Sequence, residues 1–200
     1  MLKNHLYVKI ILSTIHRMGI MAKKERIKGN CSLVPDFVFN TYADVRPEFL
    51  RELGIRALLI DIDNTLAPYE QDLPDENIIN WFSELKSAGI SAALISNNHP
   101  PRVELFNSLL GLPAYPDSGK PKRKNLLRAV REMGVPISET AGLGDQLLTD
   151  TLAVHRLGML SIIVPPIKDK RSLFFRFKRW LEKPFMKKYR KREKRKATIK

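Results

Sequence analysis

The stretch RALLIDIDNT, residues 56–65, leads from a short apolar run directly into a pair of carboxylates. An apolar run of this length between the breaker Gly54 and a polar turn predicts a buried strand. Asp61 and Asp63 are two residues apart, so both would leave the strand on the same side. One carboxylate can attack an electrophile while the other moves protons or helps to hold a metal. The alternative is a turn or a helix cap, because Asp, Asn and Thr all favour such positions.

Apolar and amphipathic segments alternate on both sides of this strand. Their periodicity and the flanking Gly and Pro residues predict further strands at 90–95, 140–143 and 159–164, and helices near 46–53, 75–88, 101–110, 121–133 and 149–157. Strands that alternate with helices are typical of a parallel sheet with helices on both faces, so we expect a Rossmann-like α/β fold. In such sheets the ligand binds outside the carboxyl ends of the strands.

A second polar group, Ser96-Asn97-Asn98, follows the expected strand at 90–95. A hydroxyl and backbone amides that lead into a helix can form an anion-binding site. The alternative is simple capping of the helix that follows.

A third group, GDQLLTD at residues 144–150, follows the expected strand at 140–143. Asp145 and Asp150 are candidates to hold or orient Mg²⁺, which prefers oxygen ligands. A loop with a cap is the alternative. Lys120, at the start of the helix expected at 121–133, could neutralise a phosphate or be one solvated charge among its basic neighbours.

Taken together, these four segments resemble the four motifs of the haloacid-dehalogenase-like (HAD) phosphatases, in the family's order. The resemblance rests on Asp-x-Asp-x-Thr at 61–65, Ser-Asn at 96–97, Lys-Pro at 120–121 and Gly-Asp-x4-Asp at 144–150, and it covers about residues 33–166. The fuller strings at 60–66, 95–98 and 144–150 are similar to the YqeG-type subclass III-A proteins of bacteria, which are related to the mitochondrial and plant phosphatidylglycerophosphate phosphatases.

The resemblance implies a role for each candidate residue. Asp61 would attack phosphorus and form an aspartyl-phosphate, and Asp63 would protonate the leaving oxygen and later activate water. The residues assigned to the phosphoryl group are Thr65, Ser96, Asn97 and Lys120, with Thr65 steadying the loop.

The resemblance also implies a Mg²⁺ site. Asp61, the backbone carbonyl of Asp63 and Asp145 would hold the ion, and Asp150 would orient it. An anionic carboxylate that attacks an anionic phosphate needs nearby positive charge, which Mg²⁺ and Lys120 would supply.

The spacing of the motifs leaves no room for a large cap domain. About 30 residues separate Asp63 from Ser96 and 24 separate Ser96 from Lys120, and each gap is filled by one strand–helix unit. We therefore expect an open site, which suits a lipid headgroup, a protein or a nucleic-acid end, or one that a partner subunit covers.

Charge is concentrated at the carboxyl end of the chain. The 200 residues carry a net charge of +14, and residues 167–200 hold 16 Lys and Arg against three acidic residues. Basic residues mixed with Phe177, Trp180 and other aromatics at helical spacing, with a break or kink at Pro184, fit an interfacial segment on anionic lipid. An RNA- or ribosome-binding arm, and a helix packed on the body with a solvated end, are the alternatives.

Hydrophobic patterning and the single cysteine indicate how the chain is divided into segments and where the protein is located. We expect a leader or mis-assigned start at 1–30, a phosphatase domain at 31–166 and a basic tail at 167–200. The apolar stretch 6–20 contains three basic residues, so no membrane span is expected. The single cysteine, Cys31, fits a reducing cytosol. The expected location is cytoplasmic, with peripheral binding to the inner face of the cell membrane.

The sequence thus favours a Mg²⁺-dependent phosphomonoester hydrolase, with phosphatidylglycerophosphate as the best substrate. Two alternatives stay open. One is a phosphatase for soluble nucleotide or sugar phosphates, and the other is a non-enzymatic RNA- or ribosome-associated protein.

Overall fold

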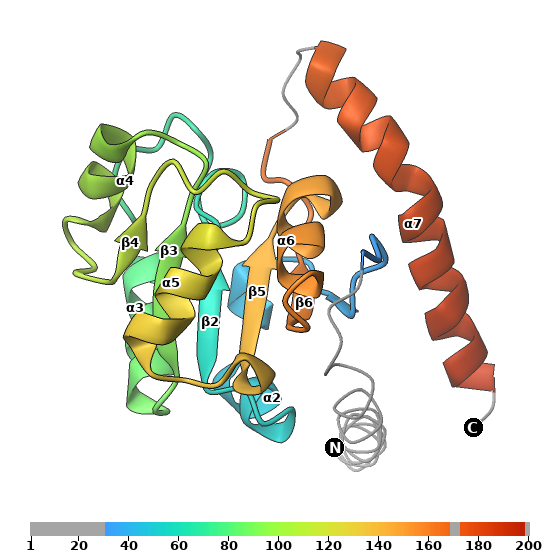
Figure 1. Ribbon diagram of the computed structural model, residues 1–200, viewed down its shortest axis with the longest axis horizontal. Helices are drawn as coiled ribbons and strands as arrows, with labels where there is room; N and C mark the ends of the chain where they lie inside the picture. The colour runs from blue at the N-terminus through green and yellow to red at the C-terminus, as the bar shows by residue number, and fades with distance from the viewer. Residues whose placement is uncertain (1–30, 169–172, 199–200) are drawn as a thin grey trace.

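The computed structural model describes residues 31–168 and 173–198, so the expected leader at 1–30 lies outside the described residues. The centre of the molecule is one sheet of six parallel strands (Figure 1). Their spatial order is β1 (Phe37–Val38), β6 (Leu160–Ile163), β5 (Thr140–Gly144), β2 (Ala57–Ile60), β3 (Ser91–Ile95) and β4 (Ala114–Tyr115). This arrangement confirms the predicted Rossmann-like α/β fold.

Helices cover both faces of the sheet, as Figure 1 shows. One layer holds α2 (Pro47–Glu52), α3 (Glu76–Ser87) and α4 (Pro100–Asn107), and the other holds α5 (Lys124–Met133) and α6 (Leu152–His155). Successive strand residues point to opposite faces. Leu58 and Ile60 of β2 therefore pack with the first layer, whereas Leu59 packs with the second.

The expected strands and helices occur, but two strands and three short helical segments were not predicted. β1 and β4 are two residues long, which is too short for any periodic pattern. The helix expected at 149–157 begins with a π-helical turn, η3 (Leu147–Thr151), before α6. Short 3₁₀ helices, η1 (Tyr42–Asp44) and η2 (Ile137–Glu139), complete the chain before the carboxyl-terminal helix.

The segments between the motifs form no separate domain. Residues between Thr65 and Ser96 supply α3 and β3, and residues between Ser96 and Lys120 supply α4 and β4. The expectation of no large cap domain is therefore confirmed.

The basic tail forms one long helix, α7 (Leu173–Thr198), that continues through Pro184. Of the break or kink predicted at Pro184, the break does not occur, because contacts with the body on both sides of the proline hold the helix. Glu182 accepts a hydrogen bond from Leu147 N at 2.7 Å, and Val38 N donates to the Tyr189 hydroxyl at 3.2 Å. In the described part of the chain, no helix combines the length and apolar character needed to cross a bilayer.

Candidate active site

Three neighbouring strands deliver the first polar residues of the site. β5, β2 and β3 lie side by side, and Asp145, Asp61 and Ser96 each follow directly on the carboxyl end of one of them. Asp61 N donates to Leu143 O at 2.9 Å, which fixes where Asp61 leaves the sheet. The sheet order thus brings together residues that are 35 to 84 positions apart in the sequence.

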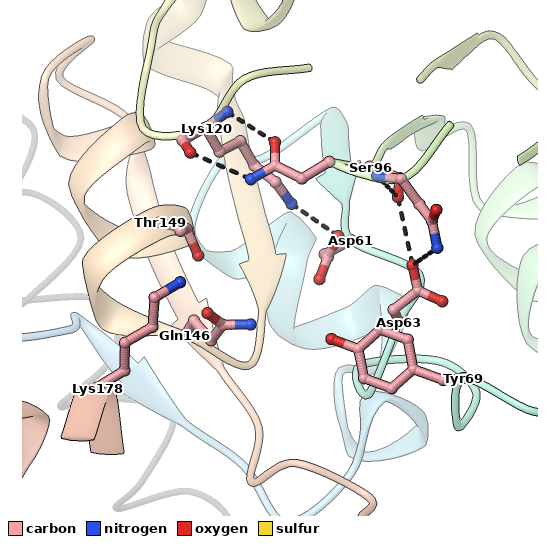
Figure 2. Close-up of a pocket in the computed structure, with 10 residues that line it drawn as sticks. Asp61, Asp63, Tyr69, Ser96, Lys120, Gln146, Thr149 and Lys178 are labelled. Atoms are coloured by element: carbon pink, nitrogen blue, oxygen red, sulfur yellow. Dashed lines mark hydrogen bonds and ion pairs between the residues drawn. The ribbon is translucent and has the colours of Figure 1, made fainter. Parts of the chain in front are cut away.

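Lys120 reaches into this group from the loop after β4. Its Nζ donates to Asp61 Oδ1 at 2.7 Å (Figure 2). It also donates to Ile95 O at 2.8 Å and lies 2.7 Å from Asp150 Oδ1. Burial by itself would lower the pKa of Lys120, but the carboxylates of Asp150 and Asp61 outweigh it and raise the pKa above its usual value. The lysine is therefore a fixed positive charge beside Asp61 and is no solvated surface residue.

Asn97 holds the lysine loop in place. Its Oδ1 accepts from Ser118 Oγ and from Lys120 N, both at 2.7 Å, and its Nδ2 donates to Lys120 O at 3.1 Å. The Asn97 side chain therefore positions Lys120 in this structure.

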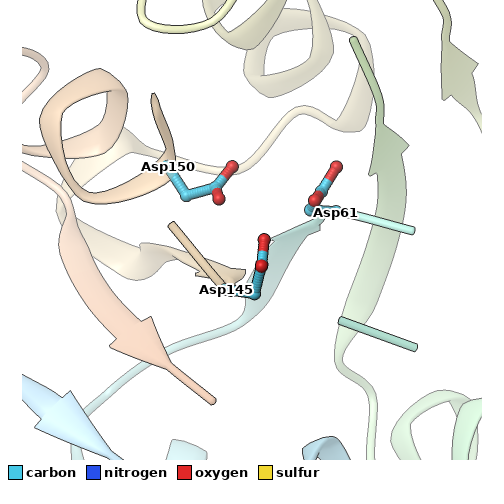
Figure 3. Close-up of side chains that lie close together, drawn as sticks. All are labelled: Asp61, Asp145 and Asp150. Carbon is cyan, nitrogen blue, oxygen red and sulfur yellow. The ribbon is translucent and has the colours of Figure 1, made fainter. Parts of the chain in front are cut away.

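Three buried carboxylates converge beside Lys120. Asp61, Asp145 and Asp150 each offer an oxygen within 4.8 Å of the others, and Figure 3 shows the three side chains facing one another. Burial raises the pKa of Asp61 to about 8, and Asp150 and Asp145 add to the shift while Lys120 opposes it. Burial and then Asp150 raise the pKa of Asp145 to about 6, against the effect of Arg179. The three carboxylates are paired with two cationic side chains, Lys120 and Arg179, so the cluster keeps a net negative charge when all five groups are ionised, which favours a bound cation.

The close approach of Asp150 depends on Gly144 at the end of β5. A Cβ at Gly144 would lie 2.4 Å from Asp150 Cγ, so any larger residue would displace that carboxylate. Gln146 N donates to Asp150 Oδ2 at 3.0 Å and fixes it from the other side.

Asp63 points to a different set of partners from Asp61. Its Oδ2 accepts from Asn98 Nδ2 at 3.3 Å and from Ser96 Oγ at 3.5 Å, and Arg102 Nη2 lies 3.3 Å from its Oδ1. The structure thus separates the two carboxylates of the pair, with Asp61 beside a lysine and Asp63 beside an arginine. Thr65 is buried, does not line the cavity, and its Oγ1 has no hydrogen-bond partner among the described residues.

A cavity of about 260 Å³ opens over this group (Figure 2). Five predicted residues line it, and they are Asp61, Asp63, Ser96, Asn97 and Lys120. The other lining residues are Tyr69, Asn98, Gln146, Thr149 and Lys178. Lys178 comes from α7, so the carboxyl-terminal helix forms part of the wall of the site.

Two residues of α7 bind the segment after β5. Arg179 forms an ion pair with the Asp145 carboxylate and donates to Asp145 O at 2.7 Å. Glu182 is 4% exposed, and its Oε1 accepts from the backbone N–H groups of Leu147 and Leu148 at 2.7 and 3.2 Å. Sequence reasoning missed both residues. Glu182 could have been identified from the sequence, because an isolated acidic residue in a strongly basic segment indicates a specific contact.

Comparison with known proteins agrees with the motifs. The family model for haloacid dehalogenase-like hydrolases matches residues 12–158. The chain is 36% identical over 151 residues to the probable phosphatase YqeG of Bacillus subtilis, and the match covers 76% of this chain and 87% of that protein.

The chain also matches two solved structures at low sequence identity. One is CbbY from Rhodobacter sphaeroides in complex with phosphate, with 18% identity, a TM-score of 0.45, and coverage of 60% of this chain and 90% of that one. The other is the deoxy-D-mannose-octulosonate 8-phosphate phosphatase of Haemophilus influenzae, with 18% identity, a TM-score of 0.42, and coverage of 46% and 60% respectively.

Proposed function

Because the chain belongs to the haloacid dehalogenase-like hydrolase family and is a phosphatase, we propose that it hydrolyses phosphomonoesters through a covalent aspartyl-phosphate on Asp61. The observation that carries this proposal is the convergence of Lys120 and the buried Asp145 on Asp61, which lines the cavity together with Lys120. A buried carboxylate beside a fixed lysine and two further carboxylates suits nucleophilic attack on an anionic phosphate.

The proposed reaction has two steps. In the first, an Asp61 oxygen attacks phosphorus, the bond from phosphorus to the leaving oxygen breaks, and Asp63 gives that oxygen a proton. In the second, Asp63 takes a proton from water, the water oxygen attacks phosphorus, and the bond to Asp61 breaks to release phosphate. Lys120 and Ser96 would hold the phosphoryl oxygens, and Asn97 keeps Lys120 in position.

The side chains at this site fit a hard divalent cation. Carboxylate oxygens are the ligands that Mg²⁺ prefers, and Asp61, Asp145 and Asp150 each offer an oxygen within 4.8 Å of the others. We propose that Asp61, Asp145 and the backbone carbonyl of Asp63 hold Mg²⁺ and that Asp150 orients the site. When bound, the ion would supply positive charge that offsets the repulsion between Asp61 and the phosphate.

We further propose that the substrate is phosphatidylglycerophosphate at an anionic membrane surface. Phe177 and Trp180 are 54% and 61% exposed, and their rings stack at 6.0 Å on the turn of α7 that also carries Lys178. Exposed basic residues continue along the helix at Lys183, Lys187 and Lys191. Each basic residue near such a surface contributes about 1 kcal/mol of attraction.

An assay with purified full-length protein tests the reaction and the metal. We expect Mg²⁺-dependent hydrolysis of p-nitrophenyl phosphate, abolished by Asp61→Asn while the circular dichroism spectrum is retained. A variant with near-normal turnover would remove Asp61 as the nucleophile. A protein that hydrolysed no phosphate ester and bound RNA with a steep salt dependence would favour the non-enzymatic alternative.

A substitution on α7 tests the membrane substrate. Truncation of the tail would also remove Arg179 and Glu182 from the site, so point variants are the better choice. Trp180→Ser should lower hydrolysis of phosphatidylglycerophosphate in anionic vesicles about tenfold or more, since an aromatic ring in the interface contributes to binding, and should leave p-nitrophenyl phosphate hydrolysis unchanged. Leu109→Ser, at a residue 57% exposed that follows α4, is the matched control. Equal activity of both variants on vesicles would favour soluble nucleotide or sugar phosphates.

A further inference from the structure

The wall of the cavity includes a positively charged side chain that has no role in the proposed reaction. Two cationic side chains line the cavity in the described part of the chain, Lys120 and Lys178. Lys120 is buried and bound to Asp61, Asp150 and Ile95 O, so it serves the phosphoryl group. Lys178 is half-buried and belongs to α7, and Figure 2 shows its ammonium group pointing toward the side of the cavity formed by Gln146 and Thr149.

The position of Lys178 is fixed by its neighbours on α7. Arg179 binds the side chain and the backbone oxygen of Asp145, and Glu182 accepts two backbone N–H groups of η3. Arg179 Nη1 also donates to Glu182 Oε2 at 3.0 Å, which joins the two anchors. One turn of α7 is therefore held in register against the segment after β5, and Lys178 stands on that turn.

The layout of the cavity indicates what Lys178 would contact. A phosphoryl group attacked by Asp61 has to lie against Asp61, Ser96 and Lys120. Its leaving group begins beside Asp63, which protonates the leaving oxygen, and Figure 2 shows Lys178 on the opposite side of Asp61, so a leaving group reaches the lysine when it extends back across the cavity. Lys178 is the positive charge among the remaining lining residues. A lysine ammonium on a cavity wall attracts an anion by charge and by donated hydrogen bonds.

We propose that Lys178 forms a second anion-binding subsite, which selects phosphomonoesters whose leaving group carries a further negative charge. The inference rests on the proposed phosphatase reaction and assigns the preferred substrate class. In this way α7 takes over the selection of substrate that a cap domain would otherwise perform.

Two soluble substrates separate this subsite from membrane binding. Glycerol 3-phosphate carries one phosphate, and glycerophosphoglycerol phosphate carries the same terminal phosphomonoester together with an anionic phosphodiester. The wild-type protein should prefer the second substrate in kcat/KM. Lys178→Ala should lower that preference about tenfold, as expected for one charge-assisted contact, and should leave kcat/KM for glycerol 3-phosphate within a factor of about two.

Lys188→Ala is the matched control. It also removes one positive charge from α7, but from an exposed residue that does not line the cavity. The preference should be unchanged in this variant and partly restored in Lys178→Arg. Equal loss on both substrates, no loss in Lys178→Ala, or the same loss in Lys188→Ala would overturn the subsite. Absence of turnover of both substrates by the wild type would instead refute the proposed function.

Discussion

Replacing Asp61 by Asn should make the metal-free protein more stable than the wild type at neutral pH, by an amount that grows with pH. Burial and the neighbouring carboxylates raise the pKa of Asp61 from 3.8 to about 8 in the folded protein. Between these values the folded state holds a proton that the unfolded chain has lost. Stability of the wild type therefore falls as pH rises through this interval.

The magnitude follows from the one proton that is released on unfolding. The free energy of unfolding should fall by about 1.4 kcal/mol for each pH unit. Because Asp61 is tightly coupled to its neighbours, we expect a change of about 2 kcal/mol between pH 5.5 and 7.5. The amide introduced by Asp61→Asn does not titrate, so the pH dependence of the difference between the two proteins reports Asp61 together with its coupling to Lys120, Asp145 and Asp150.

The assay is urea denaturation in the presence of a chelator, followed by the fluorescence of the buried Trp81. Asp72→Asn, at an exposed residue, controls for the substitution itself and should keep a constant difference from the wild type. A difference between wild type and Asp61→Asn that is flat with pH would refute the reasoning, as would a wild type that gains stability relative to the variant as pH rises.

Three further predictions follow from the same contacts. Mg²⁺ should raise the melting temperature more at pH 8 than at pH 6, because protons compete with the ion for Asp61 and Asp145. Thermal denaturation with and without Mg²⁺ at both pH values measures this shift. An equal shift at the two pH values would contradict the prediction. Gly144→Ala should push Asp150 away and lower kcat/KM for p-nitrophenyl phosphate about 100-fold, and near-normal kinetics would refute the close approach. Glu182→Gln should lower the free energy of unfolding by about 2 kcal/mol, measured by urea denaturation, and a change below about 0.5 kcal/mol would contradict the anchoring of α7.

The sequence was sufficient to predict those strands and helices that have a periodic pattern of apolar residues. The strands at 57–60, 91–95, 140–144 and 160–163 have apolar runs between breakers, and α3 has a clear amphipathic period capped by Asp75. Polar residues at the ends of three of these strands were therefore placed correctly at one edge of the sheet. Strands β1 and β4 were not predicted, because a strand of two residues has no periodic sequence pattern.

The contacts between distant segments could not be predicted. Arg179 and Asp145 are 34 positions apart, and their pairing depends on the path of α7 across the body. The same path explains why Pro184 does not end the helix, since tertiary contacts of Glu182 and Tyr189 hold the chain on both sides. The position of Arg102 beside Asp63 similarly depends on how α4 packs against the sheet.

The most direct test of the central claim is rapid-quench trapping of the phosphorylated protein. A ³²P-labelled phosphomonoester is mixed with the wild type and Mg²⁺, the reaction is stopped with acid within milliseconds to seconds, and the labelled peptide is identified by mass spectrometry. The account predicts a hydroxylamine-sensitive label on Asp61 that disappears in Asp61→Asn. Turnover without a covalent label, or a label on any other residue, would contradict it.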